Sequence, residues 1–333
     1  MCYIRPVEQQ LAEEGRVARE GAALTDRGMR GLLVARGNDR QTFLHNMLSN
    51  AITGLTPGQG CRAELLDDRG HVVADFRVHV LDGEVQLDCE TPAIAAKAFA
   101  ALDKFIIMDD VQLVDASAGT YVLTLSGPKA ADVLRAAGAV ELPAVPYASV
   151  ACQLAGRTVL VVASPWTGRG DFDIHFTETA HDLVSAALVA AGAQAISGDA
   201  FEALRIEAGV TRQTTELDDV LALEANLAPE AISFTKGCYL GQEVMARIDA
   251  RGHVNRLLVG ITLDGEVPAT RGATLRAGEK DVGRVTSSAF SPTLGKPIAL
   301  AYLRREHSAP GTPIVVRTEA GERPAVVAAL PFA

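Results

Sequence analysis

Short runs of hydrophobic residues separated by turns run through the first two thirds of the chain and predict an α+β protein. The runs at 31–36, 71–81 and 84–89 are rich in valine and leucine, which is typical of strands. Alanine-rich runs near 93–104 and 130–137 have the composition of helices. Strand, helix and strand recur in both halves of this region, so we expect two related α+β lobes.

The pattern changes at residue 257, where short alternating strands follow one another between Gly and Pro turns. Such spacing is typical of a small antiparallel barrel. The sequence therefore predicts a first lobe at 1–120, a second lobe at 121–256 and a barrel domain at 257–333. The strands expected in the barrel are 257–263, 274–276, 281–287, 298–303 and 314–317.

Composition narrows the class of protein. The chain has 333 residues, of which 48% are hydrophobic and 22% charged, as in ordinary globular proteins. Its formal net charge of −10 disfavours direct, sequence-independent binding to nucleic acid. No apolar run is long enough to span a membrane, and the acidic N-terminal stretch does not resemble a secretory signal. We therefore expect a cytoplasmic protein that contacts neither nucleic acid nor membrane.

The cysteines give no framework for disulfides or metals. There are five, scattered along the chain and without a Cys-x-x-Cys pair. This pattern argues against a disulfide scaffold, a zinc ribbon and a cluster held by four local thiolates. No metal site is expected. The cysteines are Cys2, Cys61, Cys89, Cys152 and Cys238.

The stretch 236–243, Lys-Gly-Cys-Tyr-Leu-Gly-Gln-Glu, interrupts an otherwise aliphatic region with glycines, a thiol and polar groups. Gly237 suits a turn with positive φ, and a helix is expected from Gly241 onward. Cys238 would then lie near a helix N-terminus and close to Lys236, and both features favour the reactive thiolate. The alternative is a small buried cysteine that only fills space.

This stretch, with Arg247 after it, resembles the signature of the YgfZ family. These are folate-binding proteins that assist the assembly or repair of iron-sulfur clusters, and they are relatives of the glycine-cleavage T-protein. The resemblance extends over nearly the whole chain. It implies two interwoven α+β lobes around a central channel, with a C-terminal antiparallel β-barrel and tetrahydrofolate or a folate derivative as ligand.

The resemblance also implies roles for residues of the signature. Cys238 would face the channel and do redox or transient covalent work, and Lys236 would lower its pKa and position an anionic part of the ligand. Gln242 and Glu243 would orient neighbouring groups. Tyr239 and Arg247 complete the folate-binding residues expected from this stretch.

Three acidic residues outside the signature are further candidates. By resemblance, Asp75 lies at or next to a T-protein aspartate that acts on folate; alternatively it is a solvent-facing strand residue paired with Arg77. Glu207 would border the central pocket, or else form a solvated charge pair at a helix end. Glu224 precedes the signature by a short loop and would approach it in space.

One segment departs from the T-protein pattern. Where the T-protein has a glutamate that pairs with the pterin ring, this chain has Arg169, and a guanidinium offers only hydrogen-bond donors. Asp171 or Asp173 could replace that carboxylate. We favour the simpler interpretation, in which Trp166 packs in the core and both acids line a hairpin.

These observations leave three functional hypotheses. The leading one is a folate-binding protein that assists iron-sulfur cluster assembly or repair, with iron-sulfur client enzymes or assembly proteins as partners. The first alternative is a tetrahydrofolate-dependent aminomethyltransferase or demethylase of the T-protein type, and the second is a non-catalytic folate-binding scaffold. Patterns for nucleotide hydrolysis and acyl transfer are absent from the sequence.

Overall fold

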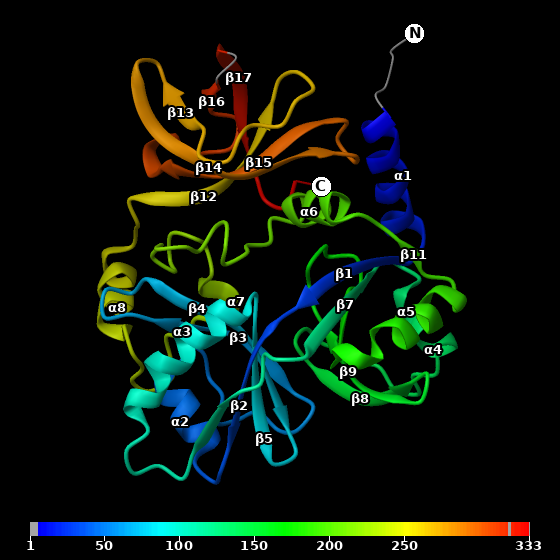
Figure 1. Ribbon diagram of the computed structural model, residues 1–333. Coiled ribbons are helices and arrows are strands. Elements are labelled where there is room, and N and C mark those ends of the chain that lie inside the picture. The colour runs from blue at the N-terminus through cyan, green and yellow to red at the C-terminus, as the bar shows by residue number, and fades with distance from the viewer. Residues whose placement is uncertain (1–5, 319–320, 333) are drawn as a thin grey trace.

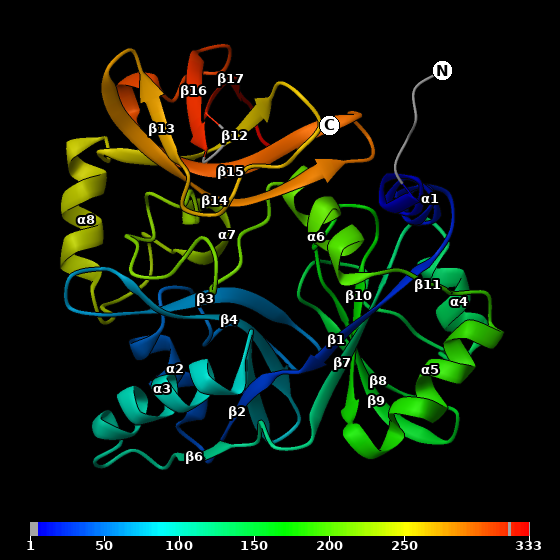
Figure 2. The ribbon, with the colours of Figure 1, turned by 45° about the horizontal axis from the view of Figure 1, so that its top comes forward.

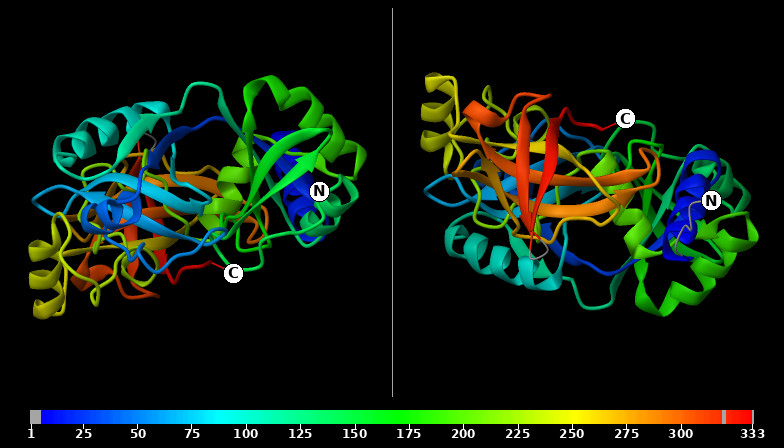
Figure 3. Two further views of the ribbon diagram at one scale, coloured as in Figure 1. Left: turned by 90° about the horizontal axis from the view of Figure 1, so that it is seen from below. Right: turned by 90° about the horizontal axis from the view of Figure 1, so that it is seen from above.

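Two β-sheets and a closed barrel organise the chain in the computed structural model, which describes residues 6–318 and 321–332 (Figure 1). The two sheets lie side by side, and the barrel lies mainly over the first of them (Figure 3). Helices cover the outer faces of both sheets. The predicted α+β class with a C-terminal antiparallel barrel is confirmed.

The first sheet has the strand order β3-β4-β5-β2-β6. One face buries aliphatic and aromatic side chains such as Leu33, Phe76 and Val78 against two helices. The opposite face carries charged side chains, because polar and apolar residues alternate along β3 and β4. The elements are β2 (Gly31–Arg36), α2 (Arg40–Met47), β3 (Gly60–Leu66), β4 (Val72–Leu81), β5 (Glu84–Cys89), α3 (Pro92–Leu102), η1 (Asp103–Phe105) and β6 (Gln112–Asp115).

The second sheet has the order β11-β1-β7-β10-β9-β8 and packs on α4 and α5 through residues such as Val133, Leu134, Val184 and Leu188. Strand β1 belongs to this sheet although the chain then continues directly into β2 of the first sheet, so the lobes are interwoven (Figure 2). The elements are β1 (Ala23–Met29), β7 (Thr120–Ser126), α4 (Ala130–Ala136), β8 (Ser149–Leu154), β9 (Arg157–Ala163), β10 (Phe172–Thr177), η2 (Glu178–Ala180), α5 (His181–Ala190) and β11 (Gln194–Ala195).

Four further helices connect these units. Helix α1 (Pro6–Glu20) packs against α6 (Gly198–Glu207), and α7 (Ala228–Ala231) packs against β3. Helix α8 (Gln242–Arg251) contributes Met245 to a core shared with the first sheet and the barrel.

The barrel closes in the order β12-β15-β14-β13-β16-β17. Its last strand pairs with its first, so no edge is left open. The chain then returns to α6, where the backbone N–H of Phe332 donates to the carbonyl oxygen of Glu207 at 2.8 Å. The elements are β12 (Arg256–Leu263), β13 (Thr274–Ala277), β14 (Lys280–Ser291), β15 (Lys296–Arg304), η3 (Arg305–His307), β16 (Pro313–Thr318) and β17 (Gly321–Ala328).

Some local expectations differ from the structure. The hydrophobic run at 106–114 predicts a single strand. Only its end forms one, in β6, because Ile107 and Met108 lie in an exposed loop.

The turn at 37–39 predicts that Asn38 or Asp39 caps the helix that follows. Asp39 precedes α2, but its side chain makes no cap hydrogen bond. Its carboxylate instead accepts a hydrogen bond of 2.8 Å from the backbone N–H of Asp110. Strands β1, β8, β11 and β17 were not predicted.

Candidate functional site

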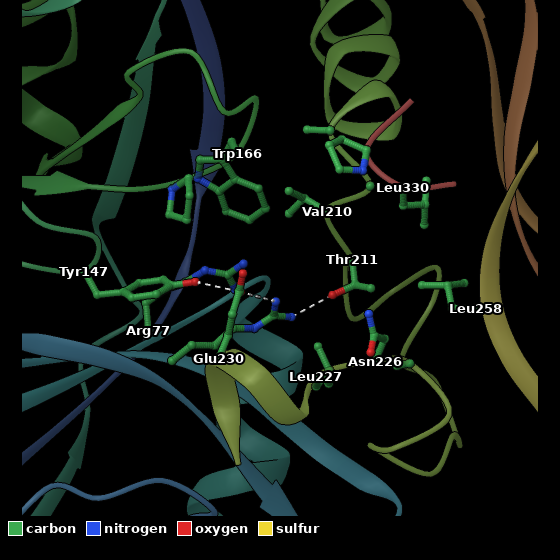
Figure 4. A pocket seen from close by; sticks show the side chains of 16 residues that line it. Arg77, Tyr147, Trp166, Val210, Thr211, Asn226, Leu227, Glu230, Leu258 and Leu330 are labelled. Atoms are coloured by element: carbon green, nitrogen blue, oxygen red, sulfur yellow. Dashed lines mark hydrogen bonds and ion pairs between the residues drawn. The ribbon is translucent and has the colours of Figure 1, made fainter. Parts of the chain in front are cut away.

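A cavity of about 240 Å³ lies where the two sheets and the barrel meet (Figure 4). Each unit of the fold supplies part of its wall, so the cavity exists only in the assembled molecule. The first sheet contributes Arg62 and Arg77, and loops of the second lobe contribute Tyr147, Pro165 and Trp166. The remaining wall is made by Ala208–Thr211, Ala225–Leu227, Glu230, Leu258, Leu330 and Pro331.

A buried ion network on β3 and β4 forms the floor. In the register of these strands Arg62 lies opposite Arg77 and Glu64 opposite Asp75, so all four side chains share one face. Arg62 donates to both oxygens of Asp75, at 2.8 and 3.0 Å, and Arg77 donates to the same carboxylate at 3.1 Å. Arg62 also donates to Thr211 Oγ1 at 2.7 Å, which ties the floor to the segment after α6.

The network fixes the charges of its two acids. Burial opposes ionisation of Asp75, but the charges of Arg62 and Arg77 hold the pKa of that carboxyl well below its usual range. Burial and the facing Asp75 carboxylate instead raise the pKa of Glu64 well above its usual value. Ionisation is therefore favoured at Asp75 and disfavoured at Glu64.

Trp166 forms one side wall and is only 2% exposed. Its indole Nε1–H donates to Asp173 at 2.7 Å, which fixes the orientation of the ring. The guanidinium carbons of Arg27 and Arg77 lie 4.2 and 4.3 Å from the ring centroid, within the range of cation–π contacts. The indole is thus a rigid, flat surface beside the cavity.

Glu230 and Tyr147 lie across the cavity from Thr211 (Figure 4). The Tyr147 hydroxyl donates to Glu230 Oε2 at 3.3 Å, and Arg62 Nη1 lies 3.7 Å from the same oxygen. Burial raises the pKa of Tyr147 to about 12, so the phenol remains a donor at neutral pH. Glu230 is the one carboxylate among the described residues that line the cavity.

Two of the four described non-glycine residues with left-handed backbone line this cavity. Tyr147 and Asn226 both line it, and both have left-handed backbone with φ of 65° and 59°. Residues other than glycine rarely adopt this conformation, which costs of order 1–3 kcal/mol and is often found at functional sites. The strain is independent support for a binding role of this cavity.

None of the site residues expected from the sequence lines the cavity in the described part of the chain. Asp75 lies beneath it, buried and held by two arginines. The alternative interpretation, in which Asp75 faces solvent, is therefore wrong. The pairing with Arg77 that it included is present. The contact of Asp75 with the cavity is indirect, through Arg62.

Glu207 and Glu224 connect the core to the barrel. Glu207 is buried and accepts hydrogen bonds from Ser291 Oγ at 2.6 Å and Thr293 Oγ1 at 2.8 Å. Glu224, also buried, accepts from Arg256 Nη2 at 2.7 Å. The interpretation of Glu207 as a solvated charge pair is therefore wrong. The residues that follow each glutamate in the chain, Ala208 and Ala225, are the ones that line the cavity.

The signature stretch forms a separate loop against β3. Helix α8 begins at Gln242 as expected, but the left-handed glycine is Gly241, with φ of 82°, and Gly237 is not left-handed. Cys238 is exposed, so it is not the buried space-filling residue of the alternative interpretation. It lies before the first turn of α8, with three residues between it and Gln242.

The other signature residues differ in their surroundings. The Lys236 ammonium donates to the carbonyl oxygen of His45 and lies 4.8 Å from the centroid of the Tyr239 ring. Burial lowers the pKa of Lys236 to about 8. Tyr239 is buried in the core shared with the barrel. On α8, Gln242 is half-buried, whereas Glu243 and Arg247 are exposed.

Within residues 6–318 and 321–332 no group of His, Cys, Asp and Glu side chains could hold a metal ion. No described helix is both long and apolar enough to cross a membrane.

Comparison with known proteins places the chain in a family. Residues 2–236 match the GCVT N-terminal domain, and residues 256–333 match the glycine cleavage T-protein C-terminal barrel domain. The chain belongs to the glycine cleavage T-protein family. The relationship to this superfamily, expected from the sequence, is therefore confirmed.

The relatives of this T-protein family member match it along its whole length. An aminomethyltransferase of Thermus thermophilus is 32% identical, covering 99% of this chain and 93% of the relative. An aminomethyltransferase of Thermosynechococcus vestitus is 29% identical, covering 97% and 87%. The crystal structure of glycine cleavage system aminomethyltransferase T from Bartonella henselae has a TM-score of 0.87 at 23% identity, covering 97% and 89%, which shows the shared fold.

Sequence reasoning missed the cavity residues Arg62, Tyr147, Asn226 and Glu230. The sequence does carry a signal for the floor of the cavity. Charges alternate in Arg62-x-Glu64 and Asp75-x-Arg77, which lie on the two paired strands β3 and β4. Such a pattern indicates a charged face that must be paired if buried. No local signal marks the other residues, which long-range folding brings together.

Proposed function

We propose that this T-protein family member binds tetrahydrofolate or a folate derivative in the cavity of Figure 4. The observation that carries the proposal is the composition of the wall: the flat indole of Trp166, the phenol of Tyr147, one carboxylate and two arginines. A pterin ring is flat and has a donor edge, and the glutamate tail of folate is anionic. At about 240 Å³ the cavity suits the ring system, with the tail extending through its mouth.

Binding is tested by calorimetric titration of the protein with tetrahydrofolate under anaerobic conditions. Val210→Trp introduces a large ring into the cavity wall and should abolish binding. The matched control is Val267→Trp, since Val267 is 59% exposed and lies outside this cavity. Cys238→Ala should bind normally. Equal binding by Val210→Trp and wild type would place folate elsewhere, and no binding by wild type would end the folate proposal.

The activity that the relatives support is one-carbon transfer from an amine to tetrahydrofolate, because the aminomethyltransferases match the chain from end to end. In such a reaction Asp75 would not accept a proton, since its carboxylate is held by Arg62 and Arg77. Its role would be to orient Arg62 at the cavity floor. Amine-dependent conversion of tetrahydrofolate, lost in Val210→Trp but retained in Cys238→Ala, would support this activity.

The second candidate is assistance to iron-sulfur cluster assembly or repair. The observation that favours it is the exposed thiol of Cys238 in the Lys-Gly-Cys-Tyr-x-Gly-Gln-Glu stretch, which lies apart from the cavity. Its test is the iron and sulfide content of iron-sulfur enzymes in cells that carry Cys238→Ala. A drop in cluster content with unchanged folate binding supports it. Unchanged cluster content, together with no amine-dependent reaction, leaves a non-catalytic folate-binding scaffold.

A further inference from the structure

Two buried histidines meet where the first and second sheets pack together. His79 lies on β4 of the first sheet and is 1% exposed, and His175 lies on β10 of the second sheet and is 8% exposed. Their ring centroids are 5.9 Å apart at an interplanar angle of 69°, which is an edge-to-face contact. A histidine in water takes up a proton at about pH 6.5, so a contact between two buried imidazoles is sensitive to acid.

His79 also contacts the loop that carries Tyr147. Its Nδ1 lies 3.4 Å from the carbonyl oxygen of Tyr147, a long hydrogen bond in which the ring donates because a carbonyl oxygen only accepts. Nε2 is buried and has no hydrogen-bond partner among the described residues. The loop lies close to the sheet, because a Cβ at Gly60, opposite His79 on β3, would be 2.3 Å from the same carbonyl oxygen. His79 therefore helps to hold this loop in place.

This loop, residues 145–148, connects the two lobes through its backbone. The N–H of Tyr147 donates to Ala163 of its own lobe at 2.7 Å, whereas the N–H of Ser149, just after the loop, donates to Gly58 before β3 at 2.9 Å. Tyr147 has left-handed backbone, so it keeps this conformation only while its surroundings hold it. Its side chain forms part of the cavity wall (Figure 4). Loss of the histidine contact would therefore free Tyr147 to move in that wall.

The surroundings of the histidine pair disfavour a further proton. Burial and the facing His175 lower the pKa of His79 to about 4. Asp88 opposes this shift, but its carboxylate is already paired with Arg30 at 2.8 Å. Asp173 also opposes it, but already accepts hydrogen bonds from two side chains of its own lobe. Other charged groups near these two carboxylates are Arg27 and Arg77, and the residues opposite His79 on β3 and β5 are the uncharged Gly60 and Gln86. A protonated His79 would thus be a buried charge without a partner of its own.

We propose that His79 is a positioning residue that holds the Tyr147 loop against the first sheet, and that its protonation in acid releases this loop and loosens the cavity wall. The inference concerns the protein without ligand, so it is independent of the proposed folate binding. An imidazole exposed by opening takes up a proton at about pH 6.5. Because the closed form excludes that proton until about pH 4, the population of the open form rises up to about tenfold per pH unit in between.

The experiment measures hydrogen–deuterium exchange by mass spectrometry at pH 7 and pH 5, in a peptide that contains Tyr147 and Ser149. The protection factor, which is the intrinsic exchange rate divided by the observed rate, removes the slowing of intrinsic exchange in acid. In wild type this protection factor should fall roughly 10- to 30-fold from pH 7 to pH 5, as expected for one linked proton. Peptides from β15, at the centre of the barrel sheet, should keep theirs.

Substitutions at the pair separate the proton from the packing. His79→Asn keeps a donor at the position of Nδ1 but cannot titrate, so its protection factor should change less than about 2-fold between the two pH values. His79→Phe keeps a ring against His175 but has no donor, so the Tyr147 peptide should exchange quickly at both pH values. His253→Gln is the matched control, because His253 is exposed and distant in sequence from the pair, and it should respond to acid as wild type does.

The outcomes that overturn the inference are distinct. If His79→Asn loses protection in acid as steeply as wild type, another group is responsible. If the β15 peptides of wild type lose protection in the same proportion as the Tyr147 peptide, acid unfolds the whole chain and releases no particular loop. Should His79→Asn fail to fold, His175→Phe takes its place, since it keeps the ring contact and removes the facing imidazole. Its loss of protection in acid should be smaller than that of wild type, and an equal loss contradicts the inference.

Discussion

At the scale of single residues, the main feature is a carboxylate that two arginines neutralise. Asp75 is 1% exposed, and removing its charge would leave Arg62 and Arg77 buried without a full partner. A buried ion pair contributes little net stability, but losing one partner is costly because the remaining charge is uncompensated. Asp75 therefore compensates two buried positive charges under the cavity.

Asp75→Asn should lower the free energy of unfolding by about 3–5 kcal/mol at neutral pH, measured by urea denaturation. Because the pKa of Asp75 is depressed in the folded state, its contribution is present above the pKa of an unfolded aspartate, about 3.9. It is lost as the pH falls through the lower folded pKa. The difference between wild type and variant should therefore shrink in acid.

The control is Asp109→Asn, at an exposed residue, which should change little. A variant as stable as wild type at neutral pH would show that Asp75 is not needed to compensate the arginines.

The thiols should differ sharply in reactivity. Cys238 is exposed, whereas burial raises the pKa of Cys61 to about 12 and also raises the pKa of Cys89 and Cys152. In a Cys2→Ser background, chosen because Cys2 lies outside the described residues, a disulfide reagent at pH 8 should label one thiol quickly. Cys238→Ala should remove that fast phase. A fast phase that persists would assign the reactive thiol to another cysteine.

At the scale of elements, the loop before α8 depends on a single glycine. Gly241 has φ of 82°, and a Cβ there would lie 2.6 Å from the carbonyl oxygen of Asp67. The glycine therefore serves two purposes, since it permits left-handed backbone and lets the loop approach the hairpin after β3. Gly252 ends the same helix with φ of 72°, but a Cβ there meets no atom within 4 Å.

Gly241→Ala should cost about 2–4 kcal/mol, because backbone strain and a clash with backbone add together. Gly252→Ala, the matched control, should cost about 1–2 kcal/mol from left-handed strain alone. Both values are measured as changes in the free energy of unfolding. Equal costs for the two variants would mean that the contact with Asp67 relaxes freely.

Local chemistry explains which elements the sequence predicted. Strands β4 and β5 were predicted because runs with hydrophobic residues at alternate positions flank the turn Asp82-Gly83. Strand β1 was missed because Asp26 and Gly28 resemble a turn, and in the structure they flank a shift in register. The start of α8 was predicted from its own first residues. The cavity was not, because its wall joins segments whose approach depends on packing of the whole chain.

At the scale of the whole molecule, the cavity lies where the first sheet, the second lobe and the barrel meet. Arg62 belongs to the first sheet, Trp166 to the second lobe and Leu258 to the barrel, and all three line it. Glu207 and Glu224 accept hydrogen bonds from Ser291 and Arg256 of the barrel, and so connect the core to it. The domain boundaries expected at 120 and 256 remain a prediction. The pairing of β1 with β7 nevertheless shows that the N-terminal part of the chain contributes a strand to the second sheet.

A ligand in such a junction should stabilise all units together. With free tetrahydrofolate at 100 times its dissociation constant, the native state gains about 2.7 kcal/mol. Differential scanning calorimetry should therefore show the whole unfolding transition moving to higher temperature. A shift in only part of the transition would mean that the ligand contacts one unit alone.

Trp166 gives the cavity a property of another kind. It is the one tryptophan in the chain, and it is buried beside the cavity with guanidinium groups near its ring. The intrinsic indole fluorescence of the protein therefore originates at the wall of the proposed binding site. A ring system entering the cavity would change that emission directly, and unfolding would shift it to longer wavelength as the indole meets water. The molecule carries its own optical reporter of whether the cavity is filled.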